Sequence, residues 1–139
     1  MSKPKVLLTR RWPDAVEKAM ASNFNLSLNQ DDKPLAAAEL EQALQDYDAI
    51  CPSVTDSMPE SMFKIDACKT RIIGNYGVGY NHLSVDAAKS RGIVVTNTHD
   101  VLTDATADLA MALLLMLARR AGEGERQIWA GKWDGWYPT

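Results

Sequence analysis

A stretch of small residues follows an apolar triplet near the middle of the chain, in the sequence IIGNYGVGYNHLSVDAA over residues 72–88. Gly77 and Gly79 have the spacing of the first two glycines in a Gly-x-Gly-x-x-Gly dinucleotide turn, and Asp100 stands at about the distance of its acidic partner. The third glycine position holds His82. An imidazole there opposes the close packing of helix on strand that this glycine allows, so the sequence disfavours a dinucleotide-phosphate turn.

The same loop has a composition suited to a smaller anion. Consecutive backbone N–H groups near Gly77, Val78 and Gly79 can converge on one carboxylate, because glycine lets the chain turn sharply. The loop follows a strand-like run, and α/β proteins bind ligands at the carboxyl ends of such strands. The alternative is a tight strand-to-helix turn that binds nothing, and the residues alone leave both interpretations open.

Four other side chains have the chemistry to take part in a site. His82 follows the glycine loop and His99 ends the last strand-like run, and for both we expect a structural role rather than proton donation. Arg10 and Arg11 end the first strand-like run. They either face the cleft or lie on the surface, the commoner outcome for charged residues.

Composition limits the possible partners and compartments. The chain has 139 residues, 46% of them hydrophobic and 24% charged, which is typical of a folded globular protein. The net charge of -3 gives no basis for binding nucleic acid. Cys51 and Cys68 form neither a disulfide framework nor a metal-ligand pattern. We therefore expect no metal site and a cytoplasmic location.

No segment predicts an association with membranes. The N-terminus lacks the long apolar stretch of a signal peptide, because it offers only a Val-Leu-Leu triplet. The longest apolar run, residues 109–118, is about half as long as a membrane span. It is typical of a buried helix.

Short apolar runs alternate with helical segments through the first hundred residues. The pattern predicts strands over 5–10, 25–29, 48–52, 71–75 and 93–97. It predicts helices over 14–23, 34–45, 60–67 and 85–90. Five successive β/α units indicate an α/β fold with a parallel five-stranded sheet and helices on both faces, of the flavodoxin-like kind.

The last third of the chain breaks this alternation. Residues 101–120 predict one long helix with Thr103 as its N-cap. An extended, aromatic-rich tail is expected after it, containing Trp129, Trp133, Trp136 and Tyr137. These rings expose more apolar area than monomers usually tolerate, so we expect them to dock on another subunit or another domain. The alternative is that the tail folds back on its own helix.

Three segments together resemble a known family. They are GNYGVGYNHLSVDAAKSRGIVVTNT, DVLTDATADLAMALLLMLARR and GEGERQIWAGKWDGWYPT. They resemble the D-isomer-specific 2-hydroxyacid dehydrogenases, and within them the glyoxylate and hydroxypyruvate reductase branch. The resemblance is close over residues 74–139 and looser before them. His99 departs from it, because relatives commonly carry proline there.

The resemblance implies where a substrate and a cofactor are bound. The substrate-binding set would be Ser53, Tyr76, Gly77, Val78 and Gly79. In this family the substrate carboxylate meets backbone amides, which correspond here to Val78 and Gly79, while the loop of residues 53–56 lines the cleft opposite. Val78 and Thr106 would lie near the nicotinamide of NAD or NADP.

The resemblance also implies a division of labour along the chain. Residues 1–100 would be the substrate-binding domain, and residues 101–139 an interdomain helix and arm that build a homodimer and lead to an absent Rossmann cofactor domain. The catalytic arginine, carboxylate and histidine of the family are not matched here, so we expect no catalytic residue in this chain.

The expected protein is thus the N-terminal, substrate-domain fragment of an enzyme that interconverts 2-keto acids and D-2-hydroxy acids. It would be inactive alone and would not retain the cofactor, which the absent domain mainly binds. The alternative is a stand-alone module that binds a small carboxylate or mediates dimerisation.

Overall fold

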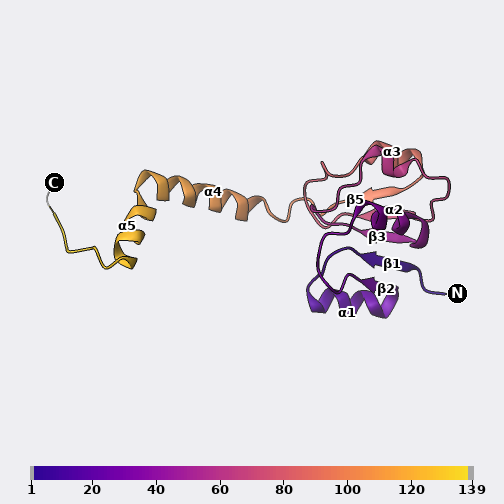
Figure 1. Cartoon of the computed structure of the whole chain (residues 1–139), viewed down its shortest axis with the longest axis horizontal. Helices are drawn as coiled ribbons and strands as arrows, with labels where there is room; N and C mark the ends of the chain where they lie inside the picture. Colours follow the sequence, from indigo (N-terminus) through magenta and orange to yellow (C-terminus); the bar gives the residue numbers. More distant parts are fainter. Residues whose placement is uncertain (1, 138–139) are drawn as a thin grey trace. The chain divides into compact units, whose positions relative to one another are not determined.

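Five short parallel strands form the centre of the first part of the chain in the computed structural model, which describes residues 2–137. The strands are β1 (Lys5–Leu8), β2 (Asn25–Leu28), β3 (Ala49–Cys51), β4 (Ile72–Gly74) and β5 (Val94–Thr96). Their order in the sheet is β2-β1-β3-β4-β5, and every neighbouring pair is parallel. The predicted five-stranded parallel sheet is confirmed (Figure 1).

The direction of travel across the sheet reverses once. The chain moves from β1 outward to the edge strand β2, then returns to the other side of β1 to form β3. Val6 is accordingly paired with Leu26 on one side and Ala49 on the other. Open α/β sheets bind ligands at the carboxyl ends of the strands beside such a reversal.

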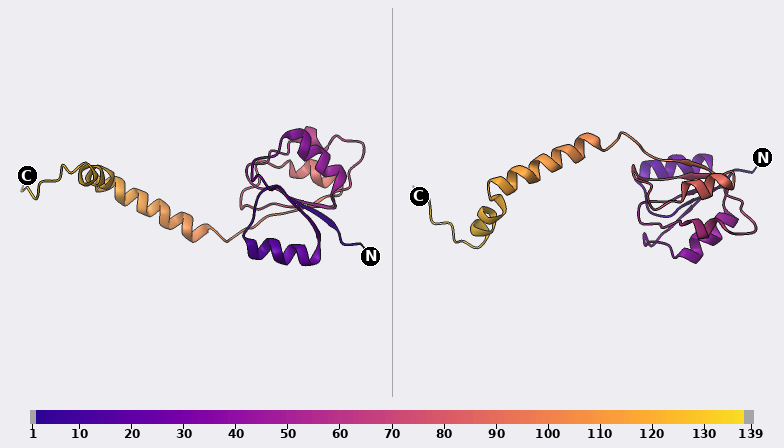
Figure 2. Two further views of the ribbon diagram at one scale, coloured as in Figure 1. Left: turned by 60° about the horizontal axis from the view of Figure 1, so that its bottom comes forward. Right: turned by 90° about the horizontal axis from the view of Figure 1, so that it is seen from above.

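Helices cover the two faces of the sheet unequally. Helix α1 (Asp14–Asn23) lies on one face, while α2 (Ala37–Asp46), η1 (Glu60–Phe63) and α3 (Val85–Ser90) lie on the other (Figure 2). Successive strand residues point to opposite faces. Leu7, Ile50 and Ile73 therefore pack in the larger core beneath α2, η1 and α3, whereas Val6, Leu8 and Cys51 join the smaller core on the α1 side.

The face that carries α1 is covered mainly over β1 and β2. Ile72 of β4 and Val94 of β5 point to this face, because Ile73 and Val95 pack in the opposite core. Ile72 is 48% exposed and Val94 is 57% exposed. These two side chains therefore form an exposed apolar area on this face, over β4 and β5.

The helix predicted over residues 60–67 is wrong beyond its first turn. Only the 3₁₀ turn η1 forms, and Lys64 ends it. The backbone N–H groups of Lys69 and Thr70 both donate to the carbonyl of Leu44, over 2.9 and 3.1 Å. These bonds to the last turn of α2 hold the chain in an extended path toward β4, which a continued helix could not follow.

The chain divides into two compact units, Met1–His99 and Asp100–Thr139. The second contains α4 (Thr103–Ala118) and α5 (Ala121–Trp129). The predicted N-cap at Thr103 is wrong, because Leu102 holds that position and no side chain caps the helix. The predicted long helix ends at Ala118.

The expected extended tail is helical over α5, so that expectation is wrong for residues 121–129. Arg120 adopts a left-handed backbone conformation with φ +52°, which turns the chain between the two helices. The Arg120 carbonyl then accepts bonds from the N–H groups of Glu123 and Gly124. Gly122 and Gly124 disfavour helix, so intrinsic propensity did not reveal α5.

Neither helix of the second unit contains a buried residue. The exposed large apolar side chains are Leu109, Met111, Leu113, Leu114, Leu115, Met116, Leu117, Ile128 and Trp129. Farther along, the rings of Trp133 and Trp136 meet edge to face, 6.2 Å apart. None of the helices within residues 2–137 is both long and apolar enough to cross a membrane.

Candidate functional site

Polar residues gather just beyond the carboxyl ends of β1, β3 and β4. Thr9 follows β1, Ser53 comes shortly after β3, and Asn75 follows β4. Ser53 and Tyr76 form an isolated parallel bridge, and the Tyr76 N–H donates to the Pro52 carbonyl over 2.8 Å. The backbone pairing of β3 and β4 thus continues past the strands and brings two predicted substrate-binding residues, Ser53 and Tyr76, side by side.

Asp56 joins the ends of β1 and β3. Its Oδ2 accepts bonds from the Thr9 hydroxyl over 2.6 Å, from the Ser53 N–H over 2.8 Å and from the Ser53 hydroxyl over 3.3 Å. The Asp56 residue is only 1% exposed. Its other carboxylate oxygen, Oδ1, is buried without a hydrogen-bond partner among residues 2–137. Asp56 therefore fixes the loop that presents Ser53.

Arg10 brings a positive charge to this loop. Its Nη1 donates to the Thr55 hydroxyl over 3.2 Å, and the Thr55 and Ser53 hydroxyls lie 2.9 Å apart. Its Nε donates to Asp32 over 2.9 Å, and this bond raises the pKa of the Arg10 guanidinium. Arg10 thus lies beside the Ser53 loop, and both of its bonds are exposed to solvent.

Arg11 has a different role from Arg10. Its Nε and Nη2 donate to the two carboxylate oxygens of Glu17, over 2.9 and 2.8 Å. The Trp12 N–H also donates to Glu17, over 2.8 Å. The bond from Arg11 and then that from Trp12 lower the pKa of the Glu17 carboxyl. Arg11 thus anchors the start of α1.

The side chain of Asn75 holds the glycine loop. It is buried, at 2% exposure, and its Nδ2 donates to the carbonyls of Gly77 and Gly79 over 3.0 and 2.9 Å. The Val78 carbonyl accepts a bond from Asn97 Nδ2 over 2.9 Å. Three successive loop carbonyls are therefore turned toward asparagine side chains.

The direction of the carbonyls sets the direction of the amides. The described part of the chain has no cis peptide bond. In a trans peptide the C=O and the following N–H point in opposite directions. The N–H groups of Val78, Gly79 and Tyr80 consequently point away from the asparagines, and none of them donates a hydrogen bond to another group of residues 2–137. They are available to an external acceptor.

The two loop glycines are needed for different reasons. A Cβ on Gly77 would stand 2.9 Å from Val54 Cγ1, whereas a Cβ on Gly79 would meet nothing within 4 Å. Neither glycine has a positive φ, so a left-handed backbone conformation is not the reason for glycine at these positions. The two positions differ in the space available for a Cβ atom. The absence of a Cβ at Gly77 allows Val54 of the Ser53 loop to approach, whereas a Cβ at Gly79 would enter open space.

His82 is linked to the glycine loop through Asn75. Its Nε2 lies 2.9 Å from Asn75 Oδ1, and its carbonyl accepts the Met58 N–H over 2.8 Å. Burial lowers the pKa of the imidazole, and the negative charge of Asp56 partly opposes this. His82 thus contacts Asn75, the residue that holds the glycine loop. His99 lies in the turn after β5.

An aromatic pair borders the site. The rings of Trp12 and Tyr76 are 4.8 Å apart and inclined by 34°. Tyr76 is about half exposed, so one side of this pair faces solvent. Thr106, the expected cofactor contact, belongs to the second unit, where it lies in the first turn of α4 with its N–H bonded to the Leu102 carbonyl over 2.9 Å.

Sequence reasoning missed the residues that organise the site. Asn75, Asn97 and Thr9 each follow a strand directly, and this was the available signal, because parallel strands bring their carboxyl ends to one edge. Asp56 was included only as one residue of a loop. Its burial and its bond from Thr9 depend on tertiary structure.

The loop is not a dinucleotide turn. In that turn a helix begins within the glycine motif and its N-terminus meets the pyrophosphate. Here β4 ends at Gly74 and α3 begins only at Val85, well past His82. The interpretation disfavoured from His82 is thus excluded by the fold.

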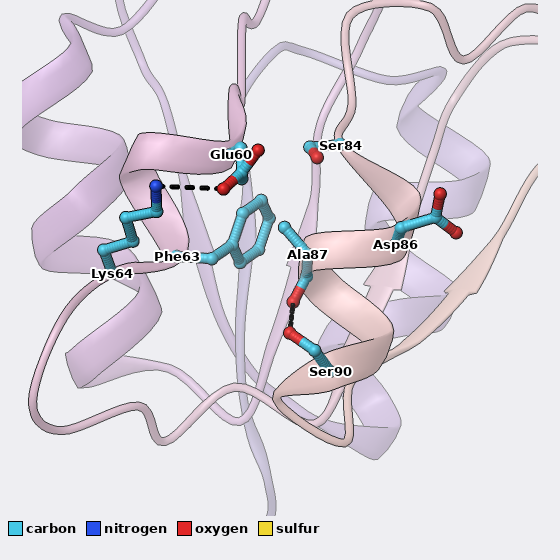
Figure 3. A pocket seen from close by; sticks show the side chains of 7 residues that line it. All are labelled: Glu60, Phe63, Lys64, Ser84, Asp86, Ala87 and Ser90. Carbon is cyan, nitrogen blue, oxygen red and sulfur yellow. Dashed lines mark hydrogen bonds and ion pairs between the residues drawn. The ribbon is translucent and has the colours of Figure 1, made fainter.

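A separate shallow pocket lies between η1 and α3 (Figure 3). Its lining consists of Glu60, Phe63, Lys64, Ser84, Asp86, Ala87 and Ser90. Lys64 is already paired with Glu60 over 2.9 Å, and the Ser90 hydroxyl with the Ala87 carbonyl over 2.7 Å. No predicted site residue lines it, so the glycine loop is the stronger candidate.

The chain is similar to known proteins over nearly its whole length. Residues 6–135 match the family model for the catalytic domain of D-isomer-specific 2-hydroxyacid dehydrogenases. The chain is 39% identical over 140 residues to glyoxylate reductase from Pyrococcus horikoshii, covering 98% of this chain and 42% of that protein. It is 34% identical over 138 residues to glycerate dehydrogenase from Hyphomicrobium methylovorum, covering 99% and 43%.

Solved structures give the same result. A glyoxylate/hydroxypyruvate reductase from Sinorhizobium meliloti, in complex with NADP and malonate, aligns with a TM-score of 0.76 at 32% identity, over 99% of this chain and 42% of that one. A glyoxylate reductase from Paecilomyes thermophila aligns with a TM-score of 0.78 at 25% identity, over 97% and 44%. The chain thus spans less than half the length of the relatives that it matches.

Proposed function

The chain belongs to the D-isomer-specific 2-hydroxyacid dehydrogenase family, and we propose that it is the substrate-binding portion of an NAD- or NADP-dependent oxidoreductase. The reaction would interconvert a small 2-keto acid, such as glyoxylate or hydroxypyruvate, and the corresponding 2-hydroxy acid of the D series. The observation that carries the proposal is the set of outward amides of Val78, Gly79 and Tyr80 at the carboxyl edge of the sheet.

These amides suit the carboxylate of a 2-keto acid. A carboxylate accepts several hydrogen bonds at once, and bonds to a charged acceptor are stronger than neutral ones. Ser53 adds a hydroxyl beside Tyr76, and Arg10 contributes a nearby positive charge through Thr55. We assign the carboxylate to the N–H groups of Val78 and Gly79, with Ser53, Tyr76 and Gly77 as the surrounding wall.

The cofactor requires a further part of the protein. Within residues 2–137 we find no strand, glycine turn and helix that would receive a pyrophosphate, because the Gly77–Gly79 loop leads into no helix N-terminus. Val78 and Thr106 would contact only the nicotinamide end. Bound NAD or NADP would supply the hydride, and a Rossmann domain in the remaining length seen in relatives would hold it.

The second unit is proposed as a dimerisation and linking element. Its two helices expose a large apolar surface, including Leu109, Leu113 and Leu117 on α4 and Trp129 on α5. Such surfaces mark sites of protein association. We assign residues 1–100 to substrate binding and residues 101–139 to homodimerisation and to the connection with the cofactor domain. Both cysteines are free, which suits a cytoplasmic location.

Calorimetric titration of the 139-residue chain with glyoxylate tests the carboxylate site. Glycolaldehyde, which carries no carboxylate, is the matched control ligand. We expect heat of binding for glyoxylate and none for glycolaldehyde. Equal behaviour of the two compounds would contradict a carboxylate site. Micromolar affinity without any cofactor would instead favour the stand-alone binding module.

A further inference from the structure

The orientation of the Asn75 side chain is fixed by its partners. Nδ2 faces two carbonyls, Gly77 and Gly79, which can only accept hydrogen bonds. The amide nitrogen, rather than the oxygen, must therefore point at the loop. Asn75 Oδ1 is then directed at His82 Nε2, 2.9 Å away. Because this oxygen can only accept, Nε2 of His82 must carry the hydrogen.

This chain of bonds reaches the Val78 amide, one of the two assigned to the substrate, and the nearby Tyr80 amide. The Gly77 and Gly79 carbonyls belong to the same peptide groups as the Val78 and Tyr80 N–H groups, so fixing the carbonyls also fixes the amides. A loop with two glycines would otherwise sample many conformations. Asn75 is itself buried at 2% exposure and has no direct path to a ligand.

We propose that Asn75 and His82 are positioning residues: Asn75 pre-orients the Val78 amide of the carboxylate site and the nearby Tyr80 amide, and the Nε2 proton of His82 keeps the Asn75 amide in the required orientation. The purpose of this positioning, which is to bind a substrate carboxylate, rests on the proposed function. The hydrogen bonds from His82 through Asn75 to the loop do not depend on it. His82 acts through Asn75, and the Nε2 proton is committed to that bond rather than to a reacting substrate.

Substitution of His82 separates positioning from simple packing. His82→Gln retains an N–H donor at a reach similar to that of Nε2, whereas His82→Leu retains bulk and loses the donor. In solution NMR, we expect the Val78, Gly79 and Tyr80 amide signals of the unmodified chain and of His82→Gln to shift together on titration with malonate. For His82→Leu, the malonate dissociation constant should rise roughly tenfold, the effect of losing about one well-placed hydrogen bond.

Asn75→Asp provides a second test, with Asn23→Asp on the exposed surface of α1 as its matched control. The new oxygen would face the two loop carbonyls without a hydrogen to donate. Malonate affinity should fall in Asn75→Asp and stay unchanged in Asn23→Asp. If Asn75→Asp does not fold, the His82 pair decides the outcome. Equal malonate affinity in His82→Leu, His82→Gln and the unmodified chain would overturn the inference.

Two readouts do not depend on a ligand. Long-range ¹H–¹⁵N spectra should show His82 protonated at Nε2, and the backbone order parameters of residues 77–80 should be near the rigid value of about 0.85 and fall in His82→Leu. An Nδ1–H tautomer, or an equally rigid loop in His82→Leu, would overturn the inference. Absence of any malonate shift in the unmodified chain would count against the proposed function, while these two readouts would still decide the positioning role.

Discussion

Thr9 donates its hydroxyl hydrogen to Asp56 Oδ2 over 2.6 Å, between the ends of β1 and β3, where the order in which strands are added to the sheet reverses. The bond ties the end of β1 to the loop after β3, and the same oxygen accepts the Ser53 N–H. Both Thr9 and Asp56 are buried. One carboxylate oxygen of Asp56 thus links the end of β1 to the Ser53 loop of the candidate site.

Removing the Thr9 hydroxyl should weaken the fold and the site together. We expect Thr9→Val to lower the free energy of unfolding by about 1–3 kcal/mol, because Asp56 stays buried and loses a donor. Thr9→Ser keeps the hydroxyl and is the matched control. Urea denaturation followed by circular dichroism measures both. A stability of Thr9→Val equal to that of Thr9→Ser would show that the bond is unimportant.

Substitution by alanine should have different effects at the two loop glycines, on stability at Gly77 and on glyoxylate affinity at Gly79. Gly77→Ala places a methyl group 2.9 Å from Val54 Cγ1, and such overpacking costs about 1–3 kcal/mol of stability. Gly79→Ala enters open space and should change stability by less than about 0.5 kcal/mol. Its methyl group is carried by the residue whose own N–H is assigned to the carboxylate, however, so glyoxylate affinity should fall roughly tenfold.

Thermal melting and glyoxylate titration of the two glycine variants check this contrast. The stability of Gly77→Ala and the affinity of Gly79→Ala are the informative quantities. Full glyoxylate affinity in a stably folded Gly79→Ala would argue against binding at this edge of the loop.

Stability should decline as the pH falls through the titration of His82. Burial holds the pKa of folded His82 below the unfolded value of about 6.5, so the unfolded chain binds the proton more readily. The stabilising contribution is complete above the unfolded pKa and is lost as the pH falls through the folded pKa. Urea midpoints between pH 7 and 5 should therefore decrease, and should decrease less in His82→Gln. Identical pH profiles would refute the assignment to His82.

The apolar surface of the second unit should hold two copies of the chain together. Light scattering should give twice the chain mass of 15.3 kDa. Leu117, which is 80% exposed on α4, is a suitable position for disruption. Leu117→Glu should shift the mass toward the monomer, whereas Gln127→Glu on α5 should leave it unchanged. A monomer at high concentration in the unmodified chain would contradict the proposed dimer.

The sheet was predictable because its strands carry a local signal. β1 and β5 are short β-branched or apolar runs, and helical segments lie between successive strands, a pattern that predicts a parallel sheet. The path of residues 64–71 was not predictable, because the bonds of Lys69 and Thr70 to Leu44 are made across the fold. Helix α5 was not predicted because its two glycines, Gly122 and Gly124, have a low helix propensity.

The candidate site, like the fold, could be predicted only in part from the sequence. The glycine spacing and the position after a strand pointed to the loop, and resemblance to a family pointed to Val78 and Gly79. The reason why these amides face outward lies in Asn75 and Asn97, whose side chains bind carbonyls brought near only by folding. The Gly77 requirement likewise depends on Val54, which belongs to another strand-end loop.

The proposed role of this chain is to supply the substrate site of a 2-hydroxyacid dehydrogenase. The direct test replaces the matching segment of the Pyrococcus horikoshii glyoxylate reductase with residues 1–139 and measures glyoxylate-dependent oxidation of NADH or NADPH. We expect activity from this chimera, roughly tenfold or greater loss with Gly79→Ala, and none from the 139-residue chain alone. A folded chimera that binds the cofactor but does not reduce glyoxylate, or full activity in Gly79→Ala, would contradict the claim.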